Sequence, residues 1–431
     1  MIKIGGTIAL LLFGAAFTFA GINIHEPYLT FLHGPGVAAF IIASFVVLFL
    51  LIERGYWAEG NVGRLLILLW CLPSLSLLYA DAAFEVCKRN VLHTDVARAH
   101  VLGQHFVVGY SSFDEIARLA EKGLIAGVYV ARHNVEGRTA ETLKSEIAAL
   151  QDRRRVAGLP ALIVAADQEG GIVSHLSPPL TALPALATLA DLPRDVRVQK
   201  AEEFGRTHGQ ELAQIGVNRD FAPVLDLRPA ADHNRFDFNT LIGQRAISGD
   251  PATVTEIGLA YVHGLEAFDV GATVKHFPGL GRVRADTHHF SAKLDTPLEQ
   301  LETSDWRPFK EVLAGSKAEL MIGHVTLTAV DPDRPASHSK RIIDGIIRRK
   351  WNYRGVVVTD DLVMGAIYNH NVCTAVVEAL NAGVDLLLVA FDGSQFYRIF
   401  ACASAALTRQ DLDMAMLHDS ETRLKRTFPI D

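Results

Sequence analysis

The sequence predicts an α/β fold, a TIM-like (β/α)8 barrel preceded by an N-terminal helical membrane region. Two patterns lead to this prediction. Apolar runs crowd into the start of the chain, and the mean hydropathy of all 431 residues is positive, at +0.21. After residue 100, eight short apolar runs rich in β-formers alternate with amphipathic helical segments. Strands and helices that alternate in this way form parallel βαβ units, and eight such units match a (β/α)8 barrel.

The membrane region is predicted from three apolar runs, Ile4–Ile22, Gly36–Ile52 and Leu65–Tyr79. A helix needs about 20 apolar residues to cross the hydrocarbon core. The first two runs meet this need, whereas the third is shorter and is interrupted by Pro73. We therefore expect two or three spans within residues 1–90. A cleaved signal peptide is the alternative for the first run, and the length of the run disfavours it.

The distribution of Lys and Arg predicts the orientation of these spans. The loop Asn23–Pro35 contains neither residue, whereas the next loop carries Arg54 and Arg64 and the N-terminus carries Lys3. Because basic loops stay on the cytoplasmic side, we expect the N-terminus to lie inside. Three spans would place residues 91–431 outside, as a periplasmic or extracytoplasmic domain of an inner (cell) membrane protein. With two spans, the same domain would face the cytoplasm.

Residues 91–431 are predicted to form the barrel. Its helices are expected at Ser112–Lys122, Ala140–Ala157, Arg194–Ile215, Ala252–Phe268, Trp306–Ala314 and Lys340–Trp351. Its eight strands are expected at His105–Gly109, Gly127–Ala131, Leu162–Ala166, Arg219–Leu225, Ala272–His276, Leu320–His324, Val356–Asp360 and Asp385–Ala390. An open doubly wound sheet is the alternative, but no G-x-G-x-x-G follows the first strand, so the main dinucleotide-binding signal of that fold is missing.

Polar side chains gather where six of the predicted strands end. These positions are Asp167, Asp226, Lys275-His276, His324, Asp360-Asp361 and Asp392. A single residue of this kind is often a solvated charge or a helix cap. Six together indicate an active site, because (β/α)8 enzymes place their catalytic groups at the C-terminal ends of the strands.

Composition excludes several other functions. The net charge of −7 argues against a nucleic-acid partner, because phosphate contacts need a basic surface. The four cysteines form no CxxC pair and no Cys/His ligand spacing, so we expect neither a zinc site nor a disulfide scaffold. No metal and no cofactor are predicted.

Two segments carry most of the chemical signal. In Lys275–His288, Asp286 and His288 are two residues apart and point the same way if the loop is extended. A carboxylate beside an imidazole holds its tautomer and supplies a proton donor and acceptor near neutral pH. In Gly355–Leu362, an apolar strand delivers Asp360 to the barrel mouth, where it can serve as nucleophile, metal ligand or electrostatic stabiliser.

These segments resemble glycoside hydrolase family 3, specifically its bacterial β-N-acetylglucosaminidase (β-hexosaminidase) subgroup. Lys275–His288 matches the subgroup pattern K-H-[FI]-P-G-[HL]-G-x4-D-[ST]-H at every fixed position, and the resemblance extends from about Val101 to Arg426. It implies a retaining exo-glycosidase that removes terminal β-linked N-acetylglucosamine. Asp360 would form a covalent glycosyl-enzyme, and His288, oriented by Asp286, would act as acid and base. The positions that would bind the sugar are Asp167, Arg245, Lys275 and His276.

The sequence departs from the subgroup in two places. Ile172 and His175 stand where arginines are usual, so the sugar preference is open, and Arg228–Thr240 is a polar insertion that we expect to be a solvated loop rather than part of the aglycone site. The alternative functions are a β-glucosidase-like hydrolase, a glycoside phosphorylase and a non-catalytic sugar-binding membrane sensor. The joint presence of Asp286, His288 and Asp360 disfavours the sensor. The expected partners are a carbohydrate with terminal N-acetylglucosamine and the membrane.

Overall fold

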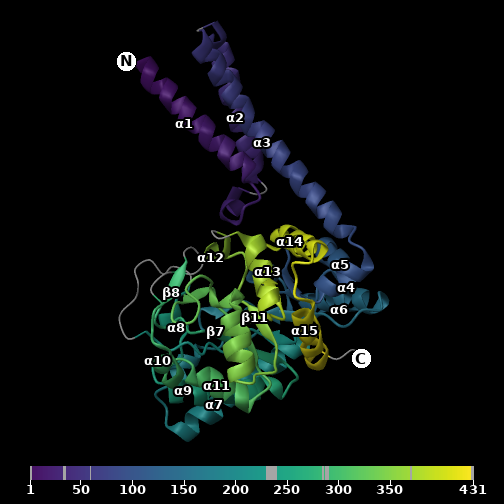
Figure 1. Ribbon diagram of the computed structural model, residues 1–431, viewed down its shortest axis with the longest axis vertical. Coiled ribbons are helices and arrows are strands. Elements are labelled where there is room, and N and C mark those ends of the chain that lie inside the picture. Colours follow the sequence, from purple (N-terminus) through teal and green to yellow (C-terminus); the bar gives the residue numbers. More distant parts are fainter. Residues whose placement is uncertain are drawn as a thin grey trace. The chain divides into compact units, whose positions relative to one another are not determined.

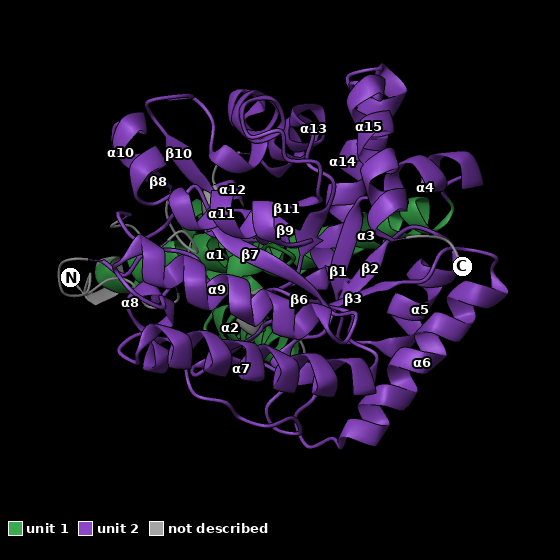
Figure 2. Cartoon of the chain, turned by 90° about the horizontal axis from the view of Figure 1, so that it is seen from below, with its two compact units in different colours: residues 1–93 green, residues 94–431 purple. Residues whose placement is uncertain are grey.

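The computed structural model describes residues 2–32, 35–58, 60–229, 240–283, 286, 291–368 and 371–428. The chain divides into two compact units, residues 1–93 and residues 94–431. Figure 1 shows the elements along the chain, and Figure 2 shows the two units in different colours.

Unit 1 is helical. It contains α1 (Ile2–Ile22), α2 (Pro35–Glu53) and α3 (Asn61–Leu92), with the short helices η1 (Pro27–Leu32) and η2 (Tyr56–Ala58) in the connections. All three long helices are long and apolar enough to cross a membrane. They also expose large apolar side chains, among them Leu12, Phe45 and Leu78, a pattern that a lipid environment would accommodate. The prediction that Pro73 interrupts the third run was wrong, because α3 continues through it to Leu92.

Helices α1 and α3 pack side by side and run in the same direction. Early in both, the Trp70 indole donates to the Leu10 carbonyl at 3.1 Å, and about two turns later the Ser76 hydroxyl donates to the Thr18 carbonyl at 3.2 Å. Gly21 permits this approach, since a Cβ there would lie 2.4 Å from the Ser76 Oγ. The contacts advance together along both helices, so the two are parallel.

Unit 2 is a barrel of eight parallel strands that neighbour one another in chain order. The strands are β1 (Phe106–Gly109), β2 (Gly127–Tyr129), β3 (Ile163–Ala166), β6 (Arg219–Asp220), β7 (Gly271–Phe277), β9 (Glu319–Ile322), β11 (Val357–Thr359) and β12 (Leu387–Val389). Each lies within a residue of its predicted range, which confirms the barrel. A parallel bridge between Val358 and Leu386 joins the two end strands, so the open-sheet alternative was wrong.

Alternate residues of the strands fill the barrel interior. This cluster contains Val107, Tyr129, Ile163, Ala165, Phe221, Met321, Val358 and Leu388. The other face of each strand packs against surrounding helices, as the near-complete burial of Phe106, Val128 and Val164 shows. Because the period of side chains along a strand is two, this alternation directs one set of apolar residues inward and the other toward the helices.

A helix follows each strand, as the predicted alternation requires. The principal helices are α5 (Phe113–Glu121), α6 (Ala140–Val156), α7 (Arg194–Ile215), α9 (Pro251–Glu266), α11 (Arg307–Gly315), the π-helix η6 (Arg341–Lys350), α13 (Val372–Ala382) and α14 (Phe396–Arg409), with α15 (Met414–Thr427) at the end. The additional short helices are α4 (Val96–Gly103), α8 (Ile242–Arg245), α10 (Leu298–Thr303) and α12 (Gly365–Tyr368). Two strand pairs lie outside the barrel, β4 (Gln168–Gly170) with β5 (Val173–Ser174), and β8 (Ala292–Leu294) with β10 (Val325–Leu327).

Unit 2 contains one disulfide among its described residues, between Cys373 in α13 and Cys402 in α14, with Cα atoms 5.1 Å apart. The sequence analysis, which expected no disulfide scaffold, did not anticipate this single bond. The pair could not be predicted from the sequence, because the two residues are 29 positions apart and belong to different helices. Only tertiary packing brings these helices within bonding distance.

Candidate active site

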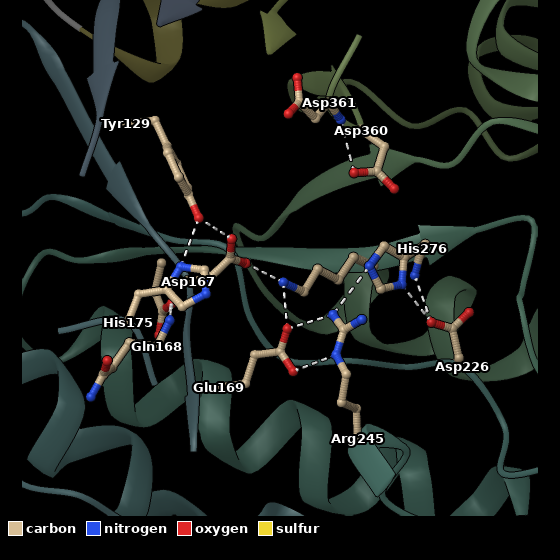
Figure 3. A network of polar contacts seen from close by, with 12 residues as sticks. Tyr129, Asp167, Gln168, Glu169, His175, Asp226, Arg245, His276, Asp360 and Asp361 are labelled. Carbon is tan, nitrogen blue, oxygen red and sulfur yellow. Dashed lines mark hydrogen bonds and ion pairs between the residues drawn. The ribbon is translucent and has the colours of Figure 1, made fainter. Parts of the chain in front are cut away.

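Four strands bring polar side chains together at the C-terminal end of the barrel (Figure 3). Asp167 follows β3, Asp226 follows β6, Lys275 and His276 lie near the end of β7, and Asp360 follows β11. The segment after β3 then folds into the β4–β5 hairpin. Gly170 has a φ of 90°, and a Cβ there would lie 2.5 Å from the Pro184 carbonyl oxygen, so the hairpin requires glycine at this position.

A chain of charges forms the base of the candidate site. The Lys275 ammonium contacts the Asp167 carboxylate and lies 2.6 Å from the Glu169 carboxylate. Arg245, which ends α8, holds the same Glu169 carboxylate with two parallel bonds of 3.0 and 2.6 Å. The side chains of Lys275, Glu169 and Arg245 are at least 91% buried, whereas that of Asp167 remains 18% exposed. Asp167 is thus the member of the chain that is most open to a ligand.

These ion pairs keep the carboxylates of Asp167 and Glu169, the Lys275 ammonium and the Arg245 guanidinium in their charged forms. Burial alone would raise the pKa of the Asp167 carboxyl, but the Lys275 ammonium outweighs it and holds that pKa below its ordinary value. Burial would likewise raise the pKa of Glu169, and Arg245 and Lys275 reverse the shift. Burial would lower the pKa of Lys275, but Asp167 and Glu169 raise it. The site therefore presents fixed charges that can hydrogen-bond a polar ligand without first changing protonation.

His276 is oriented by a carboxylate behind it. Its Nδ1 lies 2.7 Å from Asp226 Oδ2, and the same carboxylate accepts the backbone N–H groups of His276 at 3.1 Å and Leu280 at 2.7 Å. Because Asp226 accepts, Nδ1 carries the proton, and Nε2 is directed toward Arg245 Nη2 at 3.3 Å. Asp226 thus fixes both the tautomer and the ring orientation of His276.

Tyr129 and His175 flank Asp167 on its other side (Figure 3). The Tyr129 hydroxyl donates to Asp167 Oδ2 at 2.6 Å and lies 2.9 Å from His175 Nδ1. Burial lowers the pKa of His175, although Asp167 acts in the opposite direction. A neutral His175 with its proton on Nδ1 can donate to the Tyr129 oxygen, so that the hydroxyl hydrogen stays directed at Asp167.

A buried group supports the Asp167–Glu169 segment from behind. The Asp220 carboxyl, with no exposed surface, accepts the Gln168 N–H at 2.9 Å and the Tyr261 hydroxyl at 2.8 Å. Tyr261 in turn lies 2.8 Å from His208 Nδ1. Burial raises the pKa of Asp220 to about 8, and the bonds from Tyr261 and Gln168 oppose this shift. Asp220 therefore serves to position the segment.

Asp360 and Asp361 have different surroundings, although they are adjacent. The Asp361 carboxylate is buried and accepts the backbone N–H groups of Val363 and Ala390 at 3.0 Å each and of Phe391 at 2.8 Å. Burial raises the pKa of Asp361 to about 6 against these bonds. Asp360 is half-buried, and one of its oxygens accepts the Asp361 N–H at 2.8 Å. The two carboxylates point in different directions, and the Asp361 carboxylate is committed to the backbone (Figure 3).

The predicted acid–base pair is described only in part. Asp286 is buried, and its Oδ1 accepts the Thr240 hydroxyl at 3.1 Å, while the Thr240 carbonyl accepts from Arg245 at 2.9 Å. His288 lies outside the described residues, as do residues 230–239 of the insertion. Thr240, the last residue of that insertion, is buried between Asp286 and Arg245, so this end of it is not a solvated loop.

Among the described residues, the structure brings Asp167, Arg245, Lys275 and His276 together. Five further residues hold this group in place, namely Tyr129, Glu169, Asp220, Asp226 and Thr240. Sequence reasoning placed Asp226 among the polar strand ends but assigned no role to any of the five. The sequence pattern that points to Glu169 and Asp226 is their position just after a predicted strand. The pattern that points to Asp220 is a charged residue inside a predicted strand. Within the described residues, no group of three or more His, Cys, Asp or Glu side chains is placed to hold a metal ion.

Comparison with known proteins identifies relatives of unit 2. The sequence matches the family described as Glycosyl hydrolase family 3 N terminal domain over residues 100–427. The β-hexosaminidase of Pseudomonas aeruginosa (strain LESB58) is 38% identical over 234 residues, which are 54% of this chain and 67% of that protein. The β-hexosaminidase of Glaesserella parasuis serovar 5 is 33% identical over 285 residues, 66% of this chain and 78% of that protein.

Solved structures share the fold. A glycoside hydrolase family 3 β-N-acetylglucosaminidase from Paenibacillus sp. str. FPU-7 superposes with a TM-score of 0.69 and 30% identity, covering 76% of this chain and 61% of that protein. LpqI of M. tuberculosis superposes with a TM-score of 0.68 and 28% identity, covering 77% of this chain and 94% of that protein.

Proposed function

Because the chain belongs to glycosyl hydrolase family 3 and is a glycosidase, we propose that it is a membrane-anchored, retaining exo-β-N-acetylglucosaminidase. In this proposal residues 1–90 form the membrane region and residues 91–431 the catalytic barrel. The observation that carries it is the charged chain formed by Asp167, Lys275, Glu169 and Arg245, which leaves the Asp167 carboxylate open at the barrel mouth.

The chemistry follows from the groups around that chain. Asp167, Lys275, Arg245 and His276 would bind the hydroxyls of the terminal sugar and present its anomeric carbon to Asp360. Asp360 would attack that carbon while His288 protonates the departing oxygen, giving a covalent glycosyl-enzyme. His288 would then remove a proton from water, which releases the sugar with its original anomeric configuration. Buried Asp286 would orient His288 throughout.

The experiment that tests this function is hydrolysis of two aryl glycosides by the full-length protein in detergent. We expect 4-nitrophenyl β-N-acetylglucosaminide to be cleaved much faster than the β-glucoside. A reversed preference would favour the β-glucosidase alternative. A rate that rises with phosphate, with sugar 1-phosphate as product, would favour the phosphorylase, and no turnover of either substrate would favour the sugar-binding sensor.

Tyr129 offers a test of the sugar-binding groups. Tyr129→Phe removes the donor to Asp167 Oδ2, so we expect KM for the N-acetylglucosaminide to rise about 10-fold, the loss typical of a hydrogen bond to a charged group, with kcat less affected. Tyr397→Phe is the matched control, since that hydroxyl donates to the Glu115 carboxylate at 2.7 Å between outer helices. Equal effects of the two substitutions on KM would contradict a role for Asp167 in binding the substrate.

Two features of the chain support an extracytoplasmic barrel. Helices α1 and α3 are parallel, so if α1 crosses from inside to outside, α3 crosses in the same direction and residues after it emerge outside. The Cys373–Cys402 disulfide is a bond that persists in oxidising compartments and is rare in the cytosol. We therefore propose the three-span topology in the inner membrane.

A reporter fused after Asp431 tests this topology. We expect an alkaline phosphatase fusion to be active. A fusion to a fluorescent protein that matures only in the cytoplasm should be dark. In the same cells, Cys373 and Cys402 should react with a maleimide only after reduction. A bright cytoplasmic reporter, together with thiols that label without reduction, would contradict the three-span topology and leave the two-span one.

A further inference from the structure

A cavity rich in arginine lies at the end of the barrel opposite the candidate active site. Its volume is about 370 Å³. It is bordered by segments that precede β11 and β12, by η6 and by α15, and its charged lining consists of Asp344, Arg348, Arg349, Arg354, Asp419 and Arg423. Because these segments enter the strands at their N-terminal ends, the cavity has no part in the sugar site at the C-terminal ends.

One buried carboxylate serves two of these arginines. The Arg348 Nη2 donates to Asp385 Oδ2 at 2.7 Å, and the Arg423 Nε donates to Asp385 Oδ1 at 2.8 Å. The Asp385 side chain has no exposed surface, and it also accepts the Ser420 hydroxyl at 2.7 Å and the Val357 N–H at 2.8 Å. The Asp385 carboxylate carries one negative charge, whereas the guanidinium groups of Arg348 and Arg423 carry two positive charges. One positive charge is therefore not balanced by Asp385.

Both arginines retain a donor that nothing in the described part of the chain accepts. Arg348 Nε and Arg423 Nη2 are buried and have no hydrogen-bond partner among the described residues. The Arg348 side chain is 9% exposed, and burial lowers its pKa even though Asp385 acts in the opposite direction. Buried charged donors without an acceptor are costly, so they mark places where a bound acceptor would be stabilised.

The remaining arginines lie at the rim. Arg349 pairs with Asp344, and the Arg354 Nη2 donates to the Asn352 side-chain oxygen at 2.6 Å. Four arginines thus border the cavity against two lining carboxylates and buried Asp385, which leaves an excess of one positive charge.

We propose that this cavity binds a small phosphate-bearing anion. The planar fork of arginine matches the oxygens of phosphate, and four arginines line one cavity here. The volume falls in the range of about 300–1,000 Å³ that small-molecule sites occupy, so the ligand can be larger than phosphate itself. Its oxygens would accept the N–H groups that Arg348 and Arg423 leave unpaired, after a small adjustment of these side chains, and would join η6 and α15 through one ligand.

Calorimetric titration of the full-length protein in detergent with inorganic phosphate tests this site. We expect saturable binding that persists when N-acetylglucosamine saturates the sugar site. Arg423→Gln should weaken it about 10-fold or more, as for loss of a hydrogen bond between charged groups, and exposed Arg354→Gln should weaken it by up to about fivefold. Asp419→Asn, which removes a lining negative charge, should tighten binding. Arg409→Gln is the matched control, because Arg409 is exposed and pairs with Asp411 at 2.7 Å outside the cavity.

The outcomes separate this site from its alternatives. Absence of phosphate binding, or binding that is abolished by sugar and unchanged in the Arg354 and Arg423 variants, would overturn the proposal. If Arg423→Gln does not fold, the exposed positions Arg354 and Asp419 carry the test in opposite directions. Glycerol 3-phosphate is the second probe. Tighter binding than phosphate indicates an ester such as a lipid headgroup, and weaker binding indicates the free ion.

Discussion

Replacement of Asp360 by alanine is expected to lower kcat on 4-nitrophenyl β-N-acetylglucosaminide by about 10³-fold or more. The reason is that the proposed covalent step loses its nucleophile while the ion pairs among Asp167, Lys275, Glu169 and Arg245, which we propose to bind the sugar, stay intact. KM should therefore change far less than kcat. A 5-fluoro glycosyl fluoride should inactivate the wild-type protein and label Asp360, which peptide mass spectrometry can locate.

The neighbouring carboxylate provides the control for this prediction. Asp361 accepts three backbone N–H groups and is buried, so Asp361→Asn replaces one accepting oxygen by an NH2 group that cannot accept a backbone N–H. We expect it to lower the melting temperature rather than abolish labelling. A label on Asp361, or an Asp360→Ala variant that retains most of its kcat, would show that the nucleophile is a different residue.

Replacement of His288 by alanine is expected to impair a substrate with a poor leaving group about 10²–10⁴-fold, the usual range for general acid–base catalysis, and one with a nitrophenolate much less. A nitrophenolate departs with little need for protonation, whereas an alkyl or sugar oxygen needs a proton. Asp286→Asn should give a smaller defect of the same kind, because the imidazole would lose the carboxylate that we propose orients it. Parallel kcat measurements on a disaccharide and on the aryl glycoside give the difference.

Azide distinguishes acid–base catalysis from binding at His288. If the variant is slow because water is no longer activated, azide should restore turnover of the nitrophenyl substrate and yield a glycosyl azide. His418→Ala, at an exposed position paired with Glu421, is the matched control and should leave both substrates unaffected. Equal losses on both leaving groups, without rescue by azide, would make His288 a binding residue and direct the search for the acid to Asp286.

Most of the barrel could be predicted because its signal is local. An amphipathic period of 3.6 residues and short apolar runs are properties of neighbouring residues, so the strand and helix ranges follow from them. The position of the candidate site followed from the same reasoning, since Asp167, Lys275, His276 and Asp360 each end a predicted strand. The length of the third apolar helix was predicted less accurately, because a proline such as Pro73 normally breaks a helix in water. In α3, Pro73 removes only the N–H that would donate to the Leu69 carbonyl, and the helix continues to Leu92.

The sequence by itself determined the membrane-like composition of the first unit, the order of strands and helices in the second, and which end of the barrel carries the polar residues. The tertiary structure decided how those residues act on one another. Lys275 and Asp167 are separated by 108 positions, and their contact, with Glu169 and Arg245, sets the charges of the site. The burial of Asp361 and the Cys373–Cys402 bond likewise depend on groups distant in the chain. The physical reason is that pKa values and bonds depend on distance and solvent exposure, which a local pattern does not encode.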